Sequence, residues 1–280
     1  MSPLTALSEQ LRSDDPQQRA AAAAALGRAR SLDGVPALIA ALSDADRDVR
    51  RAAARSLGEV ADPQAVEPLS GALHDVHWSV RFVAAAALGE IGEGSALDAL
   101  AAALTDEEPF VRRAAADALG KLRDPQAVEP LTEALQDADG SVRSTADSAL
   151  RRIHAARAVE NLLYALGDVE LAVSTEAADR LGEIGDKRAL MPLIRSLTDR
   201  PVAVRYCAAR ALGRIGDPRA AQPLATALTD EEAGVRRAAA EALGKIGCAD
   251  SLDPLTAALS DPDRDVRWAA EQALAHLRER

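Results

Sequence analysis

Residues 43–73 read SDADRDVRRAAARSLGEVADPQAVEPLSGAL, and this 31-residue stretch returns along the chain at a constant spacing. Leucine recurs at eight positions from Leu57 to Leu274, and alanine at eight from Ala53 to Ala270. The valine column is equally regular, with Val49, Val80, Val111, Val142, Val173, Val204, Val235 and Val266. A more diverged early copy places Gln18 and Leu26 in these columns, so nine units account for nearly all 280 residues. The chain is therefore a repeat protein.

Each unit is predicted to form two helices. In residues 43–73, Asp46 is a suitable N-cap, because its carboxylate can accept bonds from the free N–H groups of the first turn. Asp139 and Asp263 match it in other copies, and Pro109 stands at a first helical position, where an N–H donor is not needed. The buried stripe of this helix follows a helical spacing, with Val49, Ala53, Ser56, Leu57 and Val60.

Glycine and Asp-Pro mark the end of this helix and the start of the other. The valine-bearing helix is predicted to stop between Gly58 and Ala61, and other copies end in Ile-Gly, which suits a left-handed cap: Gly185, Gly216 and Gly247. An Asp-Pro step such as Asp62-Pro63 then opens the second helix. Pro68 and its equivalents lie inside the second pattern, so we expect that helix to be bent or to start late.

Neither helix can bury its apolar stripe alone, so the hairpins are expected to stack into an all-α solenoid, a superhelix of nine 31-residue repeats. The alanine column would let neighbouring helices approach closely. We expect one domain over residues 1–280. Its approximate repeats are 1–42 with an N-terminal cap, 43–73, 74–104, 105–135, 136–166, 167–197, 198–228, 229–259 and 260–280 as a C-terminal cap.

The repeat resembles a known family. The order D-x-D-x-x-V-R-x-A-A-x-A-L-G-x-I-G-D-P-x-A-V-x-P-L-x-x-A-L is similar to the short HEAT-like repeat of the phycobilisome-lyase type, and the resemblance covers essentially the whole chain. It implies a HEAT-like solenoid whose valine-bearing helices line the concave side. It says little about activity, because such repeats occur in lyase subunits and in scaffolds.

The composition limits the classes of partner. Aromatic residues make up only 2% of the chain, so we expect Ala, Leu, Val and Ile to fill the core. The formal net charge of −11 weighs against nucleic acid and anionic membranes as partners. Cys207 and Cys248 form no redox or metal pair, and neither a secretory signal nor a membrane-length apolar run is found. We expect a soluble, cytoplasmic protein without a cofactor or a metal.

Two charged columns accompany the repeat, an aspartate before the valine-bearing helix and an arginine after its valine. We predict that they form a structural ladder, in which charge-assisted bonds tie each turn to the next unit. Ser174 interrupts the arginine column. The predicted ladder residues are Asp44, Arg50, Asp75, Arg81, Asp106, Arg112, Asp137, Arg143, Asp199, Arg205, Asp230, Arg236, Asp261 and Arg267. A binding role for these columns is the alternative.

Positions equivalent to 47, 51 and 55 point away from the buried stripe and vary between copies. These 24 positions hold four of the six aromatic residues, and seven arginines against three acids. Trp, Tyr and Arg are the types enriched at binding hot spots. We predict a surface for a protein or peptide with acidic and apolar groups, at Arg47, Arg51, Arg55, Trp78, Phe82, Arg113, Tyr206, Arg210, Arg237, Arg264 and Trp268. The alternative is a solvated face that has diverged without a function.

The copy at residues 136–166 departs from the pattern. Arg151 replaces the glycine at the end of the valine-bearing helix, and the Asp-Pro step is missing. A hinge or a local change in curvature would follow from this loss, and plain divergence is an equal alternative.

No catalytic constellation is predicted. His74 and His77 flank a turn without a third ligand nearby. The iron-dependent hydroxylases built on HEAT-like repeats use His-Glu pairs, and no histidine of this chain precedes a glutamate. The run from Gly89 to Gly94 is interpreted as a helix end and a loop, because a phosphate loop would follow a strand.

The sequence therefore predicts a non-catalytic scaffold that binds a protein or peptide on its concave face. One alternative, implied by the resemblance alone, is a bilin lyase-type subunit that handles a chromophore. Another is nucleic-acid binding, as in HEAT-like DNA glycosylases. Against it stand the negative net charge and three acids on the variable face, Asp117, Asp179 and Glu241.

Overall fold

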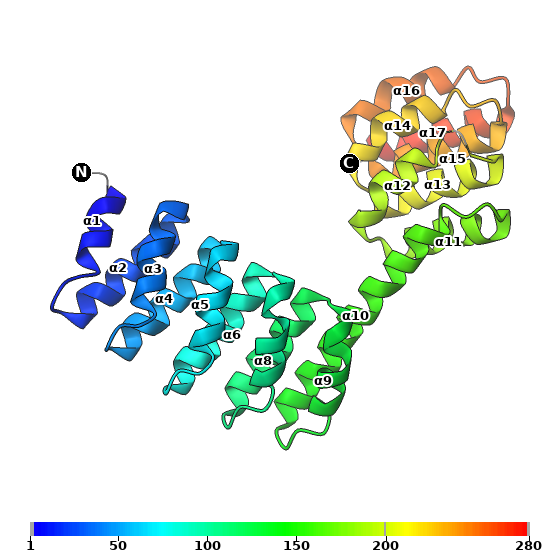
Figure 1. Ribbon diagram of the computed structural model, residues 1–280. Coiled ribbons are helices and arrows are strands. Elements are labelled where there is room, and N and C mark those ends of the chain that lie inside the picture. Colours follow the sequence, from blue (N-terminus) through cyan, green and yellow to red (C-terminus); the bar gives the residue numbers. More distant parts are fainter. Residues whose placement is uncertain (1–2, 199, 279–280) are drawn as a thin grey trace. The chain divides into compact units, whose positions relative to one another are not determined.

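The computed structural model describes residues 3–198 and 200–278, which form 17 α-helices, seven short 3-10 helices and no strand (Figure 1). The prediction of an all-α solenoid is confirmed. The chain divides into two compact units, unit 1 ending at Ala156 and unit 2 beginning at Arg157. The expectation of one domain over residues 1–280 stays a prediction, and each unit is described by itself.

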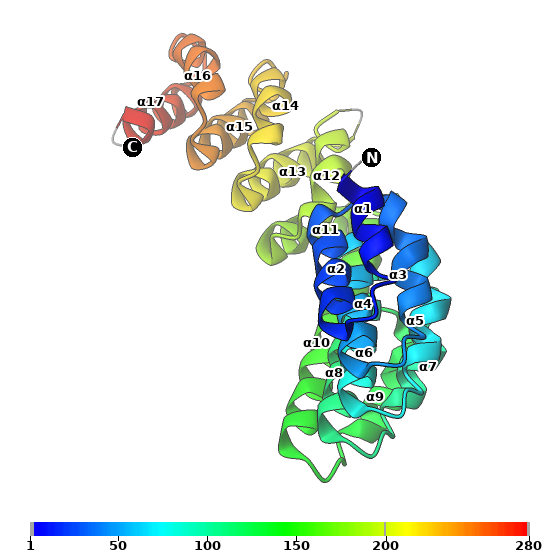
Figure 2. The same cartoon turned by 90° about the vertical axis from the view of Figure 1, so that its left-hand side faces the viewer.

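Unit 1 alternates long helices of 14 residues with short helices of seven. It begins with α1 (Pro3–Gln10), and the boundary of the unit falls within α10 (Gly140–Ala165). The long helices form one layer and the short helices a second (Figure 2). The long helices are α2 (Pro16–Ala29), α4 (Arg47–Val60), α6 (Trp78–Ile91) and α8 (Pro109–Leu122). The short helices are α3 (Val35–Ala41), α5 (Val66–Ala72), α7 (Leu97–Ala103) and α9 (Val128–Ala134).

Unit 2 is built in the same way. Each long helix packs against the next long helix, and each short helix packs against the long helix that follows it. The long helices are α11 (Leu171–Ile184), α13 (Val202–Ile215), α15 (Ala233–Ile246) and α17 (Arg264–Arg278). The short helices are α12 (Leu190–Arg195), α14 (Ala221–Ala227) and α16 (Leu252–Ala258).

The predicted caps of the long helices are confirmed. Asp46 accepts hydrogen bonds from the backbone N–H groups of Asp48 and Val49, at 2.8 and 3.2 Å, and Asp139 and Asp263 act in the same way. Pro109 is the first residue of α8. The cap glycines are left-handed, with φ of 70° at Gly185, 68° at Gly216 and 72° at Gly247. These caps end the long helices where the sequence predicts.

The second helix of each repeat starts late, as the interior prolines predict. After Asp62, a 3-10 helix precedes the α-helix, and Pro68 falls in the first α-helical turn, where no intrahelical N–H bond is lost. The carboxylate of Asp62 accepts from the backbone N–H of Gln64 at 2.8 Å. The 3-10 helices are η1 (Leu32–Gly34), η2 (Pro63–Ala65), η3 (Gly94–Ala96), η4 (Pro125–Ala127), η5 (Lys187–Ala189), η6 (Pro218–Ala220) and η7 (Ala249–Ser251).

One expected turn is absent. The sequence predicts two helices within residues 136–166, but α10 continues as a single helix of 26 residues from Gly140 to Ala165. The long helices α2, α4, α6, α8, α11, α13 and α15 each end on a residue in a left-handed conformation, whereas His154, the equivalent residue of this copy, lies inside α10. Without a glycine cap or an Asp-Pro step, nothing in the local sequence interrupts the helical hydrogen bonds.

Leucine and alanine form the core of both units. The leucine column, including Leu57, Leu88 and Leu119, is completely buried at these positions, and the short helices contribute Leu69 and Leu100. No aromatic side chain is fully buried in the part of the chain that the structure describes, and Phe82 and Tyr206 are half-buried against the core.

The closest approach between long helices involves glycine and alanine. A Cβ added to Gly89 would lie 2.8 Å from both Cα and Cβ of Ala118 on the next long helix. Equivalent contacts recur every 31 residues, at Gly58 with Ala87, Gly120 with Ala149, Gly182 with Ala211, Gly213 with Ala242 and Gly244 with Ala273. The Ala53 column, which was predicted to allow the close approach, is buried, and the glycine column was not predicted. Arg151 and Arg180 interrupt the glycine and alanine columns.

We predict that Gly89→Ala lowers the free energy of unfolding of unit 1 by about 1–3 kcal/mol, because the backbones of α6 and α8 would have to separate. Urea denaturation followed by Trp78 fluorescence in a Trp268→Phe background checks this, since Trp78 lies in unit 1. Gly71→Ala is the matched control. Nothing lies within 4 Å of an added Cβ at Gly71, so the control should unfold no earlier than the parent. Equal midpoints for all three chains would contradict the prediction.

Candidate binding surface

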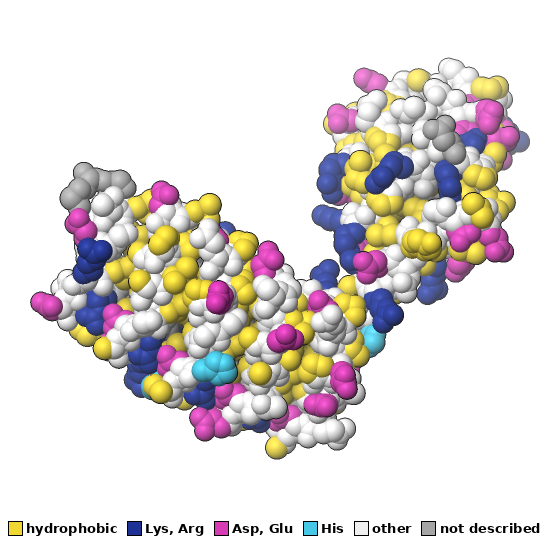
Figure 3. Space-filling model, viewed as in Figure 1, with side chains coloured by type: hydrophobic (Ala, Val, Ile, Leu, Met, Phe, Trp, Pro, Cys, Tyr) yellow, Lys and Arg dark blue, Asp and Glu magenta, His cyan; other side chains and the backbone are white. Residues whose placement is uncertain are grey.

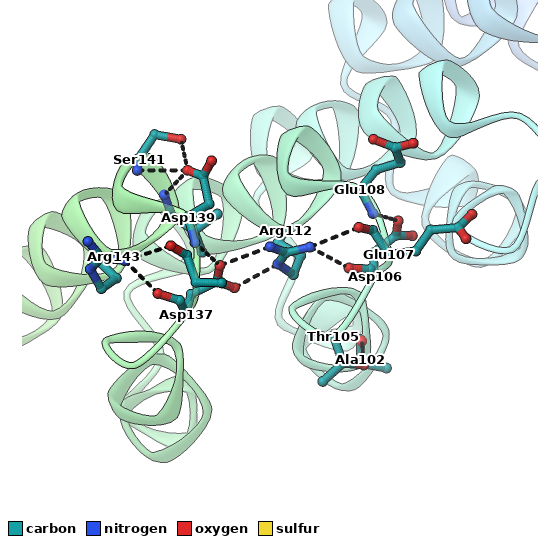
Figure 4. Close-up of polar contacts among 12 residues, drawn as sticks. Ala102, Thr105, Asp106, Glu107, Glu108, Arg112, Asp137, Asp139, Ser141 and Arg143 are labelled. Atoms are coloured by element: carbon teal, nitrogen blue, oxygen red, sulfur yellow. Dashed lines mark hydrogen bonds and ion pairs between the residues drawn. The ribbon is translucent and has the colours of Figure 1, made fainter.

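Arg112 shows how the charged columns are arranged (Figure 4). Its Nε and Nη2 atoms donate to the two carboxylate oxygens of Asp137, at 2.6 and 2.9 Å. Its Nη1 atom donates to the carbonyl oxygens of Asp106 and Glu107, at 2.8 and 3.1 Å. Asp137 also accepts from the backbone N–H of Asp139 at 2.8 Å. One guanidinium thus joins the turn before its own helix to the turn before the next long helix.

The same two-pronged pairing recurs along both units: Arg19–Asp44, Arg50–Asp75, Arg81–Asp106, Arg205–Asp230 and Arg236–Asp261. Arg19 was not among the predicted residues, although it follows Gln18 in the valine column and so occupies the arginine column. Arg143 and Arg267 bond carbonyl oxygens of their own turns, and no ion pair joins either to a carboxylate among the described residues. Asp199 lies outside the described residues.

These Arg–Asp pairs are largely withdrawn from solvent, with side chains 8–15% exposed. The bonds from Arg112 lower the pKa of Asp137 below its ordinary value of 3.8, and Arg19 and Arg236 do the same for Asp44 and Asp261. Burial by itself would raise the pKa of the other partners, but the arginine and backbone bonds outweigh it and lower the pKa of Asp75, Asp106 and Asp230. The charged groups of these Arg–Asp pairs are therefore already bonded to neighbouring turns.

The variable positions of unit 1 form an exposed long-helix face, whose first cluster consists of Arg47, Arg51, Arg55, Trp78 and Phe82 on α4 and α6. The three arginines are exposed, Trp78 is 39% exposed and Phe82 is half-buried. Arg51 is paired with Asp48 at 3.0 Å, and Arg47 donates from Nη1 to Nε2 of His77 at 2.6 Å.

Phe110 of α8 joins this cluster, although the sequence analysis missed it. Its ring stacks on Trp78 with the ring centroids 5.7 Å apart, and the guanidinium of the predicted residue Arg113 lies 5.6 Å from the Phe110 centroid. Phe110 is 52% exposed. Its column holds small or polar residues in the other clear copies, such as Asp48, Ser79 and Ser141, and this contrast was the available signal.

Four hollows open on this face of unit 1, and Phe82 lines three of them. One of about 230 Å³ is lined by Arg51, Arg55, Trp78, Ser79, Phe82, Val83 and Phe110. A second, of about 430 Å³, includes Arg30, Arg55 and Glu90. A third, of about 330 Å³, includes Arg113, Asp117 and Arg152. The long-helix face of unit 1 is therefore furrowed where its rings and arginines gather.

The second cluster lies in unit 2 and consists of Tyr206, Arg210, Arg237, Arg264 and Trp268 on α13, α15 and α17. The Arg210 guanidinium lies 5.5 Å from the Tyr206 ring centroid, and Arg237 pairs with Glu241 at 3.5 Å. Arg264 is exposed and Trp268 is 57% exposed. These positions project from the long-helix face of unit 2.

Asp179 of α11 borders the second cluster. Its carboxylate lies 3.6 Å from Arg210 and 3.5 Å from Arg214, and its Oδ2 atom is 3.6 Å from the sulfur of Cys207. Burial and then the nearby carboxylate raise the pKa of Cys207 to about 11. This thiol is therefore protonated at neutral pH and is a poor nucleophile there.

The residues that the structure describes contain no group of three or more His, Cys, Asp and Glu side chains arranged to hold a metal ion. Within the same residues, no helix combines the length and the apolar character needed to cross a bilayer. The groups of the two clusters that could contact a ligand are aromatic rings and guanidinium groups.

Tandem long and short helices, close-packed through glycine and alanine, define the class of helical repeat proteins. A model of HEAT repeats matches residues 4–86, 71–151, 128–206 and 192–275. The chain therefore belongs to the HEAT repeat family, as its sequence pattern predicts.

Several solved structures are similar to this chain. Human deoxyhypusine hydroxylase is 28% identical, with 91% of this chain and 99% of that chain covered and a TM-score of 0.42. The CpcE–CpcF complex of phycocyanin lyase from Nostoc sp. PCC7120 is 24% identical, with 99% and 95% covered and a TM-score of 0.49. Kap95p, solved with RanGDP, is 15% identical, with 98% and 45% covered and a TM-score of 0.45. No curated protein matches the sequence significantly.

We predict that Arg112→Met lowers the free energy of unfolding of unit 1 by about 1–3 kcal/mol more than Arg143→Met, because it leaves the Asp137 carboxylate without its guanidinium partner. Arg143 is a matched control, since both arginines donate to two carbonyl oxygens of their own turns but only Arg112 is paired with a carboxylate. Urea denaturation of each variant at neutral pH measures the difference.

The same difference should depend on pH. Because Arg112 lowers the pKa of Asp137 in the folded chain, the stabilisation is complete above the ordinary value of 3.8 and is lost as the pH falls through the folded-state pKa. The stabilities of the two variants should therefore begin to converge as the pH falls below about 4 and should become equal only below the folded-state pKa of Asp137. A difference that stays constant into acid would show that the ion pair is not its source.

We predict that Cys207, examined in a Cys248→Ser chain, reacts with iodoacetamide at pH 8 at least about 100-fold more slowly than glutathione, because its raised pKa leaves little thiolate. Mass spectrometry of timed samples gives the rate. Asp179→Asn should speed the reaction, since it removes a negative charge beside the sulfur. Alkylation of Cys207 as fast as that of glutathione would refute the assignment.

Proposed function

We propose that this HEAT repeat protein is a non-catalytic scaffold that binds a protein or peptide on its long-helix face, which we take to be the concave side. Two clusters would make the contacts, the first cluster in unit 1 with Arg113 and the second cluster in unit 2. The proposal concerns each face by itself and assumes nothing about the arrangement of the units.

One observation carries this proposal: the ladder arginines and the first-cluster arginines differ in what they bond. A paired ladder arginine such as Arg112 is nearly buried and bonds a carboxylate of the next turn and carbonyl oxygens of its own turn. Arg55 is exposed and has no ion-pair partner among the described residues, and the pair between Arg51 and Asp48 is half-exposed and therefore weak. These side chains are not needed for stacking and are free to meet a ligand.

The aromatic residues support the same conclusion. Only six aromatic residues occur in the chain, and the core is built without them. Exposing Trp78, Phe110 and Trp268 to water costs free energy that a purely structural surface would avoid. Aromatic and arginine side chains side by side are typical of interface hot spots.

The partner is expected to carry acidic and apolar groups. The short-helix side of unit 1 is turned to the viewer in Figure 3, where hydrophobic atoms are interrupted by isolated charges of both signs. On the long-helix face, the acids Glu59, Glu90 and Asp117 line the hollows beside the arginines and interrupt the basic surface. A polyanion that tracks a long basic surface is therefore not the ligand that this face favours. A partner with local carboxylates beside an apolar anchor fits better.

We predict that Trp78→Ala/Trp268→Ala weakens binding of the partner by about 30-fold or more, which corresponds to about 2 kcal/mol for one lost hot spot. The partner is first captured on the immobilised intact chain and identified, and its purified form is then titrated by calorimetry. Both tryptophans are exposed, so the variant should fold as the parent does, which circular dichroism verifies.

Tyr164→Ala is the control, because Tyr164 is an aromatic residue that is 86% exposed but lies outside both clusters. It should bind like the parent. A partner that binds the double variant as tightly as the parent would rule out both clusters as its principal site.

A further inference from the structure

The most specific feature of the long-helix face is the hollow of about 230 Å³ in unit 1, which we call the aromatic hollow. It lies between α4, α6 and α8, and its lining residues are Arg51, Arg55, Trp78, Ser79, Phe82, Val83 and Phe110. No acid is among them, although the chain as a whole has a net charge of −11.

Four acids line the neighbouring hollows, and two of them, Glu90 and Asp117, are paired with residues outside the aromatic hollow. Of the other two, Asp48 is paired with Arg51, and Glu59 lies on the same helix as Arg55. Glu90 accepts from Lys121 at 2.7 Å, and Asp117 is bonded by Lys121 at 3.1 Å and by Arg152 at 2.9 Å. Arg55 has no such partner among the described residues, and Arg51 holds only the exposed carboxylate of Asp48. The balance at the hollow is thus an excess of free guanidinium, which suits a carboxylate from outside.

The faces of the rings are partly in use. Phe110 is stacked on Trp78, and Arg113 lies over the Phe110 ring. A protein site for single-stranded nucleic acid binds each base by stacking it on the open face of an aromatic side chain. The hollow instead presents rings and the Val83 side chain around a small space, which suits an inserted aliphatic or aromatic side chain.

We propose that the aromatic hollow binds a short acidic peptide segment, taking one large apolar side chain into the space between Trp78, Phe82 and Phe110. Carboxylates on either side of that side chain are held by Arg51 and Arg55. The inference rests on the proposed function and deepens it, because it names the class of segment and assigns it to unit 1 alone. The apolar side chain of the peptide provides most of the binding free energy, and the arginines make the site specific for an acidic segment.

The probe for the test is a fluorescein-labelled short peptide of alternating Glu and Asp with a single Leu at its centre. Two further peptides are matched to it, one with Ser in place of Leu and one with Gln and Asn in place of the acids. Fluorescence anisotropy with the full chain measures each affinity. The Leu peptide should bind at least about tenfold more tightly than either matched peptide.

Variants of the chain then locate the site. Arg55→Gln and Phe110→Ala should each weaken binding of the Leu peptide about tenfold or more. Arg180→Gln is the control, because Arg180 is an exposed arginine of unit 2 outside both clusters, and it should leave the affinity unchanged. The substitutions at Arg55 and Phe110 lie on different helices, so a folding defect in one variant still leaves the other variant to test the site. Thermal melting followed by circular dichroism establishes that each variant is folded.

Equal binding of the Leu and Ser peptides, or wild-type affinity of both Arg55→Gln and Phe110→Ala, would overturn the inference. Tighter binding of oligothymidine, or of phosphatidylserine-containing vesicles, with loss on Phe110→Ala would assign the hollow to another class of ligand and would also overturn it. If the Leu peptide does not bind but binding of a captured protein still requires Trp78 and Trp268, only the inference about the aromatic hollow is wrong. If that protein binds the double tryptophan variant normally, the proposed function fails separately.

Discussion

The close approach of glycine to alanine between consecutive long helices is the constraint on which the rest of this molecule depends. A Cβ on Gly58 or Gly89 would lie within 3 Å of the next helix, so these backbones are as near to each other as they can be. Leucine and alanine fill the core between helices packed at that distance. Arg151 and Arg180, which interrupt the glycine and alanine columns, stand on either side of the boundary between the units in the sequence.

Close helices bring their N-terminal turns together, and the Arg–Asp ladder is the consequence. The Arg112 guanidinium has two carbonyl acceptors in its own turn and a carboxylate in the next, so one side chain fixes the offset between two repeats. The apolar column determines how near the helices come, and the ladder determines how they are aligned. Both sets of residues are then committed to stacking, which leaves only the outward positions of the long helices free to vary. Function in such a scaffold is expected where the repeats differ, as at Trp78 and Phe82.

Much of the fold could be read from the spacing, because each repeat presents the same local signals several times. The caps at Asp46 and Gly185, the late start of the short helices and the direction of the variable face all follow from one helix at a time. The candidate site was predicted less completely. A helical wheel gives the direction of a side chain from its own axis but not its neighbour on the next helix, and so Phe110 was missed. Arg19 was missed because its copy has diverged in the valine column.

By itself, the sequence determined the 31-residue period, the pairing of a long helix with a short one, and the residues that face solvent, because these depend on local hydrogen bonding and on the helical period. Only the tertiary structure decided which side chains of the variable face meet. Trp78 and Phe110 stack although they lie on different repeats, and their contact is set by the offset between two close-packed helices. The tertiary structure also decided that α10 runs on through a position where every neighbouring repeat turns. A missing cap permits both a turn and a continuous helix, and packing selects between them.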